Sequence, residues 1–272
     1  MTTKTKIEMI SKTINKMKRY EMQLRVRSIR KIIIPLLLLA ATTSHAQFII
    51  TDKDGYTNIR KQPNAKSEIT GKVLKNQIFF HTDIICGFDT EINPESDWLQ
   101  ITTDGTNIAG YIYKGNIVPL EKFSTLGDGD GNGGYRGVFF IDNGKITCTN
   151  DTMQVILFTK PFDLKAHKTD ARKDDYVDYY TCTKIDGKYF LGTDGMLPGS
   201  EIKALEITHK GKKIIVPTNK LKHCYNLNAM WVYIGTKNEL YVGIGGGDGA
   251  GGYNVWFSII GGKIMYVIET GC

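Results

Sequence analysis

Short runs in which apolar and polar residues alternate make up much of the chain after residue 47. The run from Asp97 to Ile101 is one example, with Leu99 and Ile101 separated by a polar residue. Alternation with a period of two is typical of strands that bury one face. Turn signals such as Asp104-Gly105 divide these runs at intervals of roughly 8 to 12 residues. The pattern predicts an all-β protein of sandwiches or barrels.

The first 46 residues differ from the rest. Residues 1–31 are polar and basic, and residues 32–41 form an apolar run of ten. A membrane-spanning helix needs about 20 apolar residues, so this run predicts no transmembrane segment in the mature chain. Ser44 and Ala46 supply the small residues of a cleavage site, which predicts a secretory signal peptide at 1–46. Met22 is an alternative start. An uncleaved anchor and an amphipathic tail are the alternative interpretations of the segment. We expect a periplasmic or extracellular protein after cleavage near Ala46.

The formal net charge of +7 comes from this N-terminal segment. Residues 1–46 hold ten of the 35 basic residues and two of the 28 acidic ones, which leaves 25 basic and 26 acidic residues and a net charge of −1. A body close to neutrality gives no electrostatic reason to expect nucleic acid as a partner.

The stretch from Asp54 to Asn64 predicts a strand between two turns. Gly55 can adopt a positive φ, Tyr56 and Ile59 suit a small β core, and Pro63 begins a turn signal. Two later motifs follow this one in order. The three are Gly55-Tyr56-x-Asn58-Ile59-Arg60-x-x-Pro63, Asp97-Trp98-Leu99-x-Ile101 and Gly110-Tyr111-Ile112.

In this order and spacing the motifs resemble those of the bacterial SH3-like (SH3b) domain, over residues 54–120. The resemblance implies a small SH3-like barrel within residues 48–120. It also implies a module that binds peptides or cell-wall material and is not itself catalytic. The segment from Gly87 to Ser96 is a long insert relative to the family pattern, and it bears on the shape of any ligand groove.

Aromatic side chains of this segment are the candidate ligand contacts, because aromatic-lined grooves bind peptides in other small β barrels. The alternative for each ring is core packing. We assign Trp98 to the core and Tyr56 or Tyr113 to the groove. The candidate ligand-binding residues are Tyr56, Asn58, Arg60, Tyr111 and Tyr113.

Residues 121–272 predict a second β domain, a sandwich or barrel, with a duplicated glycine-rich hairpin. Residues 127–146 and 245–264 align without gaps and share 12 of 20 positions. The unit is a glycine-rich turn, a strand, a hairpin turn and a second strand. We expect the two copies to form equivalent units, with Phe139, Ile141, Phe257 and Ile259 in the core.

The first copy also resembles half of a calcium loop, through Asp128, Asp130 and Asn132. An EF-hand loop needs a bidentate acid at its twelfth position, and that position is Phe139 here. We therefore favour a structural turn in which Asp130 and Asp248 accept backbone N–H bonds. No metal and no cofactor are expected.

The spacing of the cysteines does not indicate a metal site or a catalytic site. The five cysteines contain no C-x-x-C pair, so zinc is not expected. In an oxidising compartment they allow one or two disulfides, and buried thiols are the alternative. A cysteine hydrolase needs a nucleophile beside a histidine, yet Cys148 and Cys182 lie in strand-like segments. The five are Cys86, Cys148, Cys182, Cys224 and Cys272.

Together these patterns predict an exported, non-catalytic binding protein whose SH3-like domain recognises cell-envelope peptides or peptidoglycan. An inhibitor or immunity-type protein that binds a partner enzyme is the alternative. A cell-wall hydrolase is a lower alternative.

Overall fold

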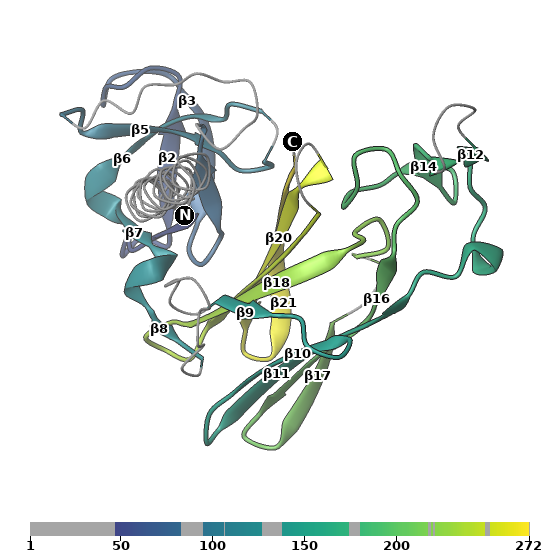
Figure 1. The fold of residues 1–272 in the computed structure, drawn as a ribbon. Coiled ribbons are helices and arrows are strands. Elements are labelled where there is room, and N and C mark those ends of the chain that lie inside the picture. The colour runs from purple at the N-terminus through teal and green to yellow at the C-terminus, as the bar shows by residue number, and fades with distance from the viewer. Residues whose placement is uncertain are drawn as a thin grey trace, which may run out of the picture. The chain divides into compact units, whose positions relative to one another are not determined.

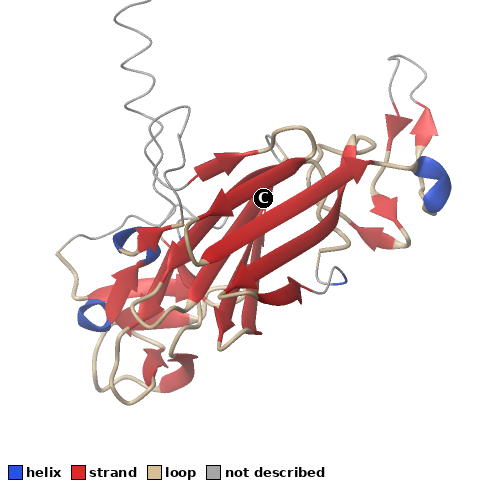
Figure 2. Ribbon diagram, turned by 90° about the horizontal axis from the view of Figure 1, so that it is seen from below, coloured by secondary structure: helices blue, strands red, loops and turns tan. Residues whose placement is uncertain are grey.

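The computed structural model describes residues 47–82, 95–105, 107–126, 138–173, 180–216, 219, 221–247 and 251–271. Strands dominate this part of the chain, and its helices are short 3-10 turns (Figure 2). The all-β class expected from alternation is therefore confirmed. Within these ranges no helix has the length and apolar character needed to span a bilayer. The expected signal peptide lies outside the described residues.

The N-terminal strands form one antiparallel sheet of seven, in the order β3-β2-β6-β5-β4-β1-β7. Figure 1 labels β2, β3, β5, β6 and β7 of this sheet. Ile59, Phe79, Leu99 and Ile112 are among the buried residues of its core. The strands are β1 (Gln47–Ile50), β2 (Tyr56–Arg60), β3 (Ile69–Leu74), β4 (Phe79–His81), β5 (Trp98–Thr102), β6 (Gly110–Tyr113) and β7 (Ile117–Pro119). Two 3-10 turns, η2 (Lys114–Asn116) and η3 (Leu120–Lys122), flank β7.

Two further antiparallel sheets follow. The six-stranded sheet contains β8 (Ser124–Thr125), β9 (Val138–Phe140), β18 (Leu227–Ile234), β19 (Leu240–Gly246), β20 (Tyr253–Ile260) and β21 (Lys263–Gly271). The four-stranded sheet contains β10 (Lys145–Thr149), β11 (Met153–Pro161), β16 (Ser200–His209) and β17 (Lys212–Val216). Two short pairs and one 3-10 turn complete the described elements: β12 (Arg172–Lys173) with β13 (Tyr180–Thr181), β14 (Lys184–Ile185) with β15 (Lys188–Tyr189), and η4 (Leu164–Ala166).

The six-stranded and four-stranded sheets bury their facing sides in one core. Leu157 and Leu205 from the four-stranded sheet join Val232, Val242 and Phe257 from the six-stranded sheet in a single cluster. Apolar residues that alternate along each strand meet in this way when two sheets pack face to face. The arrangement is a β-sandwich.

The other face of the six-stranded sheet is also covered. Trp256 and Tyr241 form a second buried cluster with Phe80 of β4 and with Ile78, which immediately precedes β4. The Tyr241 hydroxyl donates a 2.9 Å hydrogen bond to Asn76 Oδ1. Every residue of β19 is buried, as expected for a strand with both faces covered. Residues 45–272 form one compact unit, and the predicted division into domains near residue 120 stays a prediction.

The glycine-rich repeat is equivalent only at its hairpin turn. In the second copy, Gly261 and Gly262 adopt φ of 57° and 80° and connect β20 to β21, which pair along their length. In the first copy, Asn143 and Gly144 adopt φ of 47° and 76°. Beside that turn, Asp142 and Lys145 form a single β-bridge. Beyond it the two strands do not pair with each other, because β9 pairs with β18 and β10 pairs with β11. The expected equivalence of the two units is therefore wrong beyond the turn.

The physical reason is that a turn motif fixes only local backbone geometry, whereas the available neighbours decide strand pairing. Phe257 and Ile259 lie in the core as predicted, and Ile141 packs against the same cluster. The calcium candidates Asp128, Asp130 and Asn132 lie outside the described residues, as do Asp248 and the side chain of Phe139.

Candidate functional site

An open groove of about 630 Å³ crosses the outer face of the N-terminal sheet. We call it the aromatic groove, because three of its lining side chains are Tyr56, Trp98 and Tyr113. Asn58 and Arg60 line it beside Tyr56. Four of the five residues chosen from the sequence thus lie together. Tyr111, the fifth, is not among the lining residues, and its hydroxyl accepts a 3.2 Å hydrogen bond from Gln100 Nε2.

Strand alternation explains why these side chains share a face. On β2, Thr57 and Ile59 are buried, so Tyr56, Asn58 and Arg60 project from the opposite side of the sheet. On β5, Leu99 is buried and Trp98 is only half-buried. The expectation that Trp98 is a core residue is therefore wrong. In the sequence, Trp98 lies out of phase with Leu99 and Ile101, and this alternation indicates that Trp98 faces away from the core.

Ring contacts fix the aromatic wall of the groove. Trp98 and Tyr113 are direct cross-strand partners on β5 and β6. Their ring centroids are 5.8 Å apart with an interplanar angle of 66°, an edge-to-face contact. On the other side, Lys72 Nζ lies 3.7 Å from the Tyr56 ring centroid, which is cation–π geometry. Tyr113 remains 44% exposed, so its ring is accessible to a ligand.

Two hydrogen-bonded side chains shape the groove and were not selected from the sequence. Asp52 Oδ2 accepts hydrogen bonds from Thr57 Oγ1 (3.1 Å) and Asn116 Nδ2 (3.0 Å). These bonds connect the segment before β2 to η2. No motif of the sequence placed Asp52 near Asn116, because the two are 64 positions apart and only the fold brings them together.

Arg60 holds the loop that follows β2. Its Nη1 donates a 2.7 Å hydrogen bond to the Ser67 carbonyl, and the Gln62 N–H donates to Ser67 Oγ at 2.9 Å. Pro63, in the same loop, lines the groove. No second partner of the Arg60 side chain occurs among the described residues, so its other N–H groups are left for a ligand.

Asn58 carries an unusual polar atom. Its Oδ1 is buried and has no hydrogen-bond partner within the described part of the chain. A buried acceptor without a donor reduces stability by about 1–3 kcal/mol relative to a paired one. Groups of this kind persist where function requires them. Asn58 is therefore the candidate hydrogen-bonding residue of the groove.

Replacing Asn58 with alanine is expected to leave the free energy of unfolding within about 0.5 kcal/mol of wild type, or to raise it, because an unpaired buried acceptor is removed. The matched control is Asn116→Ala, which removes the bond to Asp52 and is expected to cost about 1 kcal/mol. Urea denaturation followed by circular dichroism measures both. A larger loss for Asn58→Ala than for Asn116→Ala contradicts this assignment.

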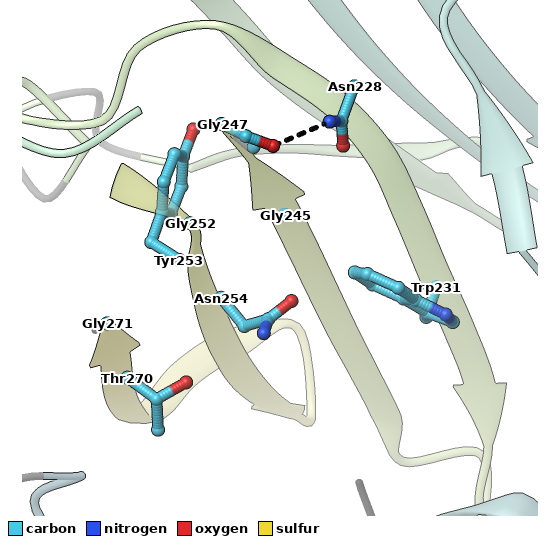
Figure 3. A pocket seen from close by; sticks show the side chains of 10 residues that line it. Asn228, Trp231, Gly245, Gly247, Gly252, Tyr253, Asn254, Thr270 and Gly271 are labelled. Carbon is cyan, nitrogen blue, oxygen red and sulfur yellow. Dashed lines mark hydrogen bonds between the residues drawn. The ribbon is translucent and has the colours of Figure 1, made fainter. Parts of the chain in front are cut away.

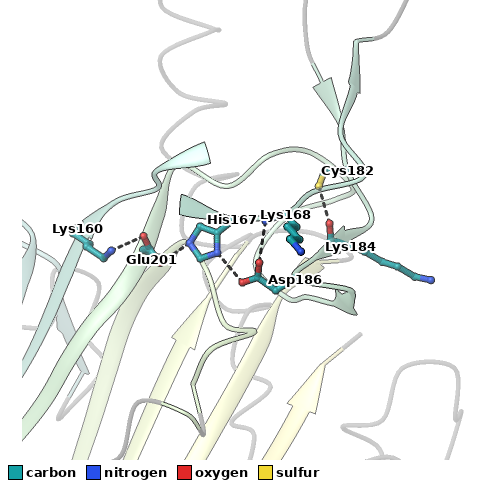
Figure 4. A network of polar contacts seen from close by, with 7 residues as sticks. All are labelled: Lys160, His167, Lys168, Cys182, Lys184, Asp186 and Glu201. Carbon is teal, nitrogen blue, oxygen red and sulfur yellow. Dashed lines mark hydrogen bonds and ion pairs between the residues drawn. The ribbon is translucent and has the colours of Figure 1, made fainter. Parts of the chain in front are cut away.

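A second polar cluster lies far along the chain, around His167 (Figure 4). His167 Nδ1 contacts Asp186 Oδ2 at 2.8 Å, and its Nε2 contacts Glu201 Oε2 at 3.2 Å. Lys160 Nζ lies 2.8 Å from the other oxygen of Glu201, so a basic side chain lies beside each oxygen of that carboxylate. No group of three metal-ligating side chains suited to an ion occurs within the described ranges. The cluster ties η4 to β16.

Two histidines that contact carboxylates, His167 and His223, have raised pKa values. Partial burial acts to lower the pKa of His167, but the hydrogen bond to Asp186 and the charge of Glu201 outweigh it, and the pKa is raised. The 2.7 Å contact from His223 Nε2 to Glu269 Oε2 raises the pKa of His223. The hydrogen bond between His167 and Asp186 also lowers the pKa of the Asp186 carboxyl.

Stability is therefore expected to fall as pH rises above about 6.5, the ordinary histidine pKa. A folded-state pKa above the unfolded value stabilises the protein fully below the unfolded pKa, and this contribution is lost as pH rises through the folded pKa. Urea denaturation at pH 5.5 and pH 8.5 measures the effect. His223→Gln should reduce the difference between the two pH values, and an unchanged difference contradicts the assignment.

The described cysteines are buried free thiols: Cys148, Cys182 and Cys224. Burial raises the pKa of Cys148 far above its ordinary value. Burial, together with the nearby Asp170, raises the pKa of Cys182 to about 11. A protonated thiol is a poor nucleophile, so neither is prepared for covalent catalysis at neutral pH. Cys86 and Cys272 lie outside the described residues.

No protein-family model matches the chain, and no curated protein matches it.

Proposed function

We propose that the chain is an exported, non-catalytic binding protein whose aromatic groove holds an extended peptide of the cell envelope, such as the stem peptide of peptidoglycan. The observation that carries this proposal is the gathering of three aromatic rings, one arginine and one unpaired amide oxygen in a single groove. The proposal assigns residues 48–120 to the bacterial SH3-like family.

The groove chemistry suits an extended peptide better than a compact metabolite. Its rings, Tyr56, Trp98 and Tyr113, offer flat apolar surface of the kind on which peptide-binding β domains hold extended chains. Arg60 keeps N–H donors for a ligand carboxylate, a charge-assisted contact. Asn58 lines the groove, and its side-chain amide has the donor and acceptor groups that pair with a peptide bond. The rings therefore suit peptide side chains, Arg60 suits a carboxylate, and Asn58 suits the peptide backbone.

Export follows from the N-terminal pattern. We expect the exported protein to begin near Gln47, because Ser44 and Ala46 form the small-residue cleavage signal. Mass spectrometry of the protein recovered from outside the cytoplasm measures this directly. Recovery of mature protein that still carries residues 1–46 contradicts the signal-peptide assignment.

A pull-down with purified peptidoglycan, run beside one with solubilised envelope proteins, tests the function. The proposal predicts retention on peptidoglycan, lost in Trp98→Ala/Tyr113→Ala and kept in Tyr189→Ala. Tyr189 is the matched control because its side chain is 74% exposed and lies outside the groove. Capture of a single envelope protein by the wild type, without retention on peptidoglycan, supports the inhibitor alternative. Release of soluble muropeptides supports the hydrolase alternative.

A further inference from the structure

A second cavity, of about 290 Å³, lies at one end of the six-stranded sheet (Figure 3). We call it the glycine pocket, because five glycines of β19, β21 and the connections next to β19 and β20 form much of its surface. Trp231, Asn254 and Thr270 supply side chains from β18, β20 and β21. None of the described residues lines both this cavity and the aromatic groove.

Strand register explains the pocket. Gly245 pairs with Asn254, and Asn254 pairs with Thr270, so the three form a row across β19, β20 and β21. A Cβ at Gly245 would lie 2.8 Å from Asn254 Oδ1 and 2.9 Å from the Trp231 ring. The missing side chain therefore lets the indole and the amide approach each other over the backbone. Figure 3 shows Trp231 and Asn254 on either side of β19.

Trp231 is a supported aromatic surface. Its ring stacks on Trp256 with centroids 5.9 Å apart and an interplanar angle of 26°. Trp256 stacks in turn on Tyr233 at 6.1 Å and 14°. Trp256 is 2% exposed, whereas Trp231 is half-buried and borders the pocket. The stack fixes the orientation of Trp231 in advance of any ligand.

Within the described part of the chain, several polar side chains of the pocket lack hydrogen-bond partners. Among the described residues, the side chains of Asn254 and Thr270 make no hydrogen bond, although Thr270 is only 6% exposed. The Tyr253 hydroxyl is buried and unpaired, in a residue that is 3% exposed. The Asn228 side-chain amide already donates to the Gly247 carbonyl at 3.1 Å. Unpaired donors and acceptors beside a cavity are expected to bind a ligand that supplies both.

Among the residues that the structure describes, no charged side chain lines the pocket. A charged ligand would lose its hydration there without gaining a countercharge. A neutral ligand with many hydroxyl groups and one apolar face matches the amides, the hydroxyls and the indole together. The volume lies at the lower end of the range for small-molecule sites, which favours a single ring over a longer chain.

We propose that the glycine pocket binds a neutral pyranose sugar, with the apolar face of the ring on Trp231 and its hydroxyl groups on Asn254 and Thr270. This inference rests on the six-stranded sheet alone. It does not depend on the peptide-binding function proposed for the aromatic groove.

The test uses the full mature chain labelled with ¹⁵N-tryptophan and titrated with N-acetylglucosamine, glucose, glucuronate and adenosine. The two neutral sugars should shift the indole N–H resonance of Trp231 and leave that of Trp98 unchanged, and glucuronate should bind about tenfold more weakly or not at all. Asn254→Ala and Thr270→Val should each weaken the neutral sugars by about tenfold. Thr270→Val removes the hydroxyl group and preserves the shape of the side chain. Tyr113→Ala, in the aromatic groove, should bind the sugars as wild type does.

Four outcomes overturn the inference. The first is the absence of a Trp231 shift with either neutral sugar. The second is equal or tighter binding of glucuronate. The third is unchanged sugar binding in a folded Thr270→Val variant. The fourth is a Trp231 shift with adenosine but with no sugar, which would assign the pocket to a flat heteroaromatic ring instead.

Discussion

Replacing Trp256 with alanine is expected to lower the free energy of unfolding by about 3–5 kcal/mol, the range for a large buried aromatic side chain. Trp256 is 2% exposed and stacks on both Trp231 and Tyr233. It also packs in the cluster that contains Phe80 of the N-terminal sheet and Ile78 just before β4. Its loss would therefore open a cavity where the two sheets meet, and domains of this size are typically stable by only about 5–15 kcal/mol.

Urea denaturation followed by circular dichroism measures this loss without relying on tryptophan fluorescence. Tyr189→Ala is the matched control, because Tyr189 is 74% exposed and its truncation should change the free energy of unfolding by no more than about 0.5 kcal/mol. A Trp256→Ala variant within about 1 kcal/mol of wild type would show that the cluster contributes little to stability.

The double variant Trp98→Ala/Tyr113→Ala is expected to weaken peptidoglycan-peptide binding by about 30-fold or more, which corresponds to a loss of at least about 2 kcal/mol. The two rings contact each other edge to face and form one wall of the aromatic groove. Aromatic residues of this kind commonly supply most of the binding energy at a recognition surface. The free energy of unfolding should fall by only about 1–2 kcal/mol, because both rings are partly exposed.

Calorimetric titration with a soluble stem peptide measures the loss of affinity, and denaturation measures the cost in stability. Tyr111→Phe is the matched control within the same sheet, since the Tyr111 hydroxyl bonds to Gln100 and does not line the groove. Wild-type affinity in the double variant, or a loss of affinity in Tyr111→Phe as large as that of the double variant, argues against the groove.

Local pattern was enough to predict the strands and most of the groove. Alternation along Tyr56–Arg60 and Trp98–Thr102 fixes which side chains share a face, and both stretches form strands in the structure. Trp98 is large enough for a core residue, but it precedes the buried Leu99 on β5 and therefore projects from the opposite face of the sheet. Large aromatic residues are usually buried, but a binding groove is a site where they are not.

The pairing of strands that are far apart in the sequence could not be predicted from local sequence patterns. The glycine-rich copies share 12 of 20 residues, yet β9 and β10 enter different sheets whereas β20 and β21 stay paired. The glycine pocket depends on Gly245 lying between Trp231 and Asn254. That proximity follows from the register of three strands, which the spacing of residues along one chain does not specify.

The three tryptophans provide the most direct test of the central claim, that the aromatic groove is the site of peptide binding. Trp98 lines the groove, Trp231 borders the glycine pocket and Trp256 is buried. In a ¹⁵N-tryptophan-labelled mature chain, titration with a soluble peptidoglycan stem peptide should shift the Trp98 indole N–H resonance, with Trp231 and Trp256 unchanged. A shift confined to Trp231, or no shift of Trp98 at saturating peptide, would contradict the claim.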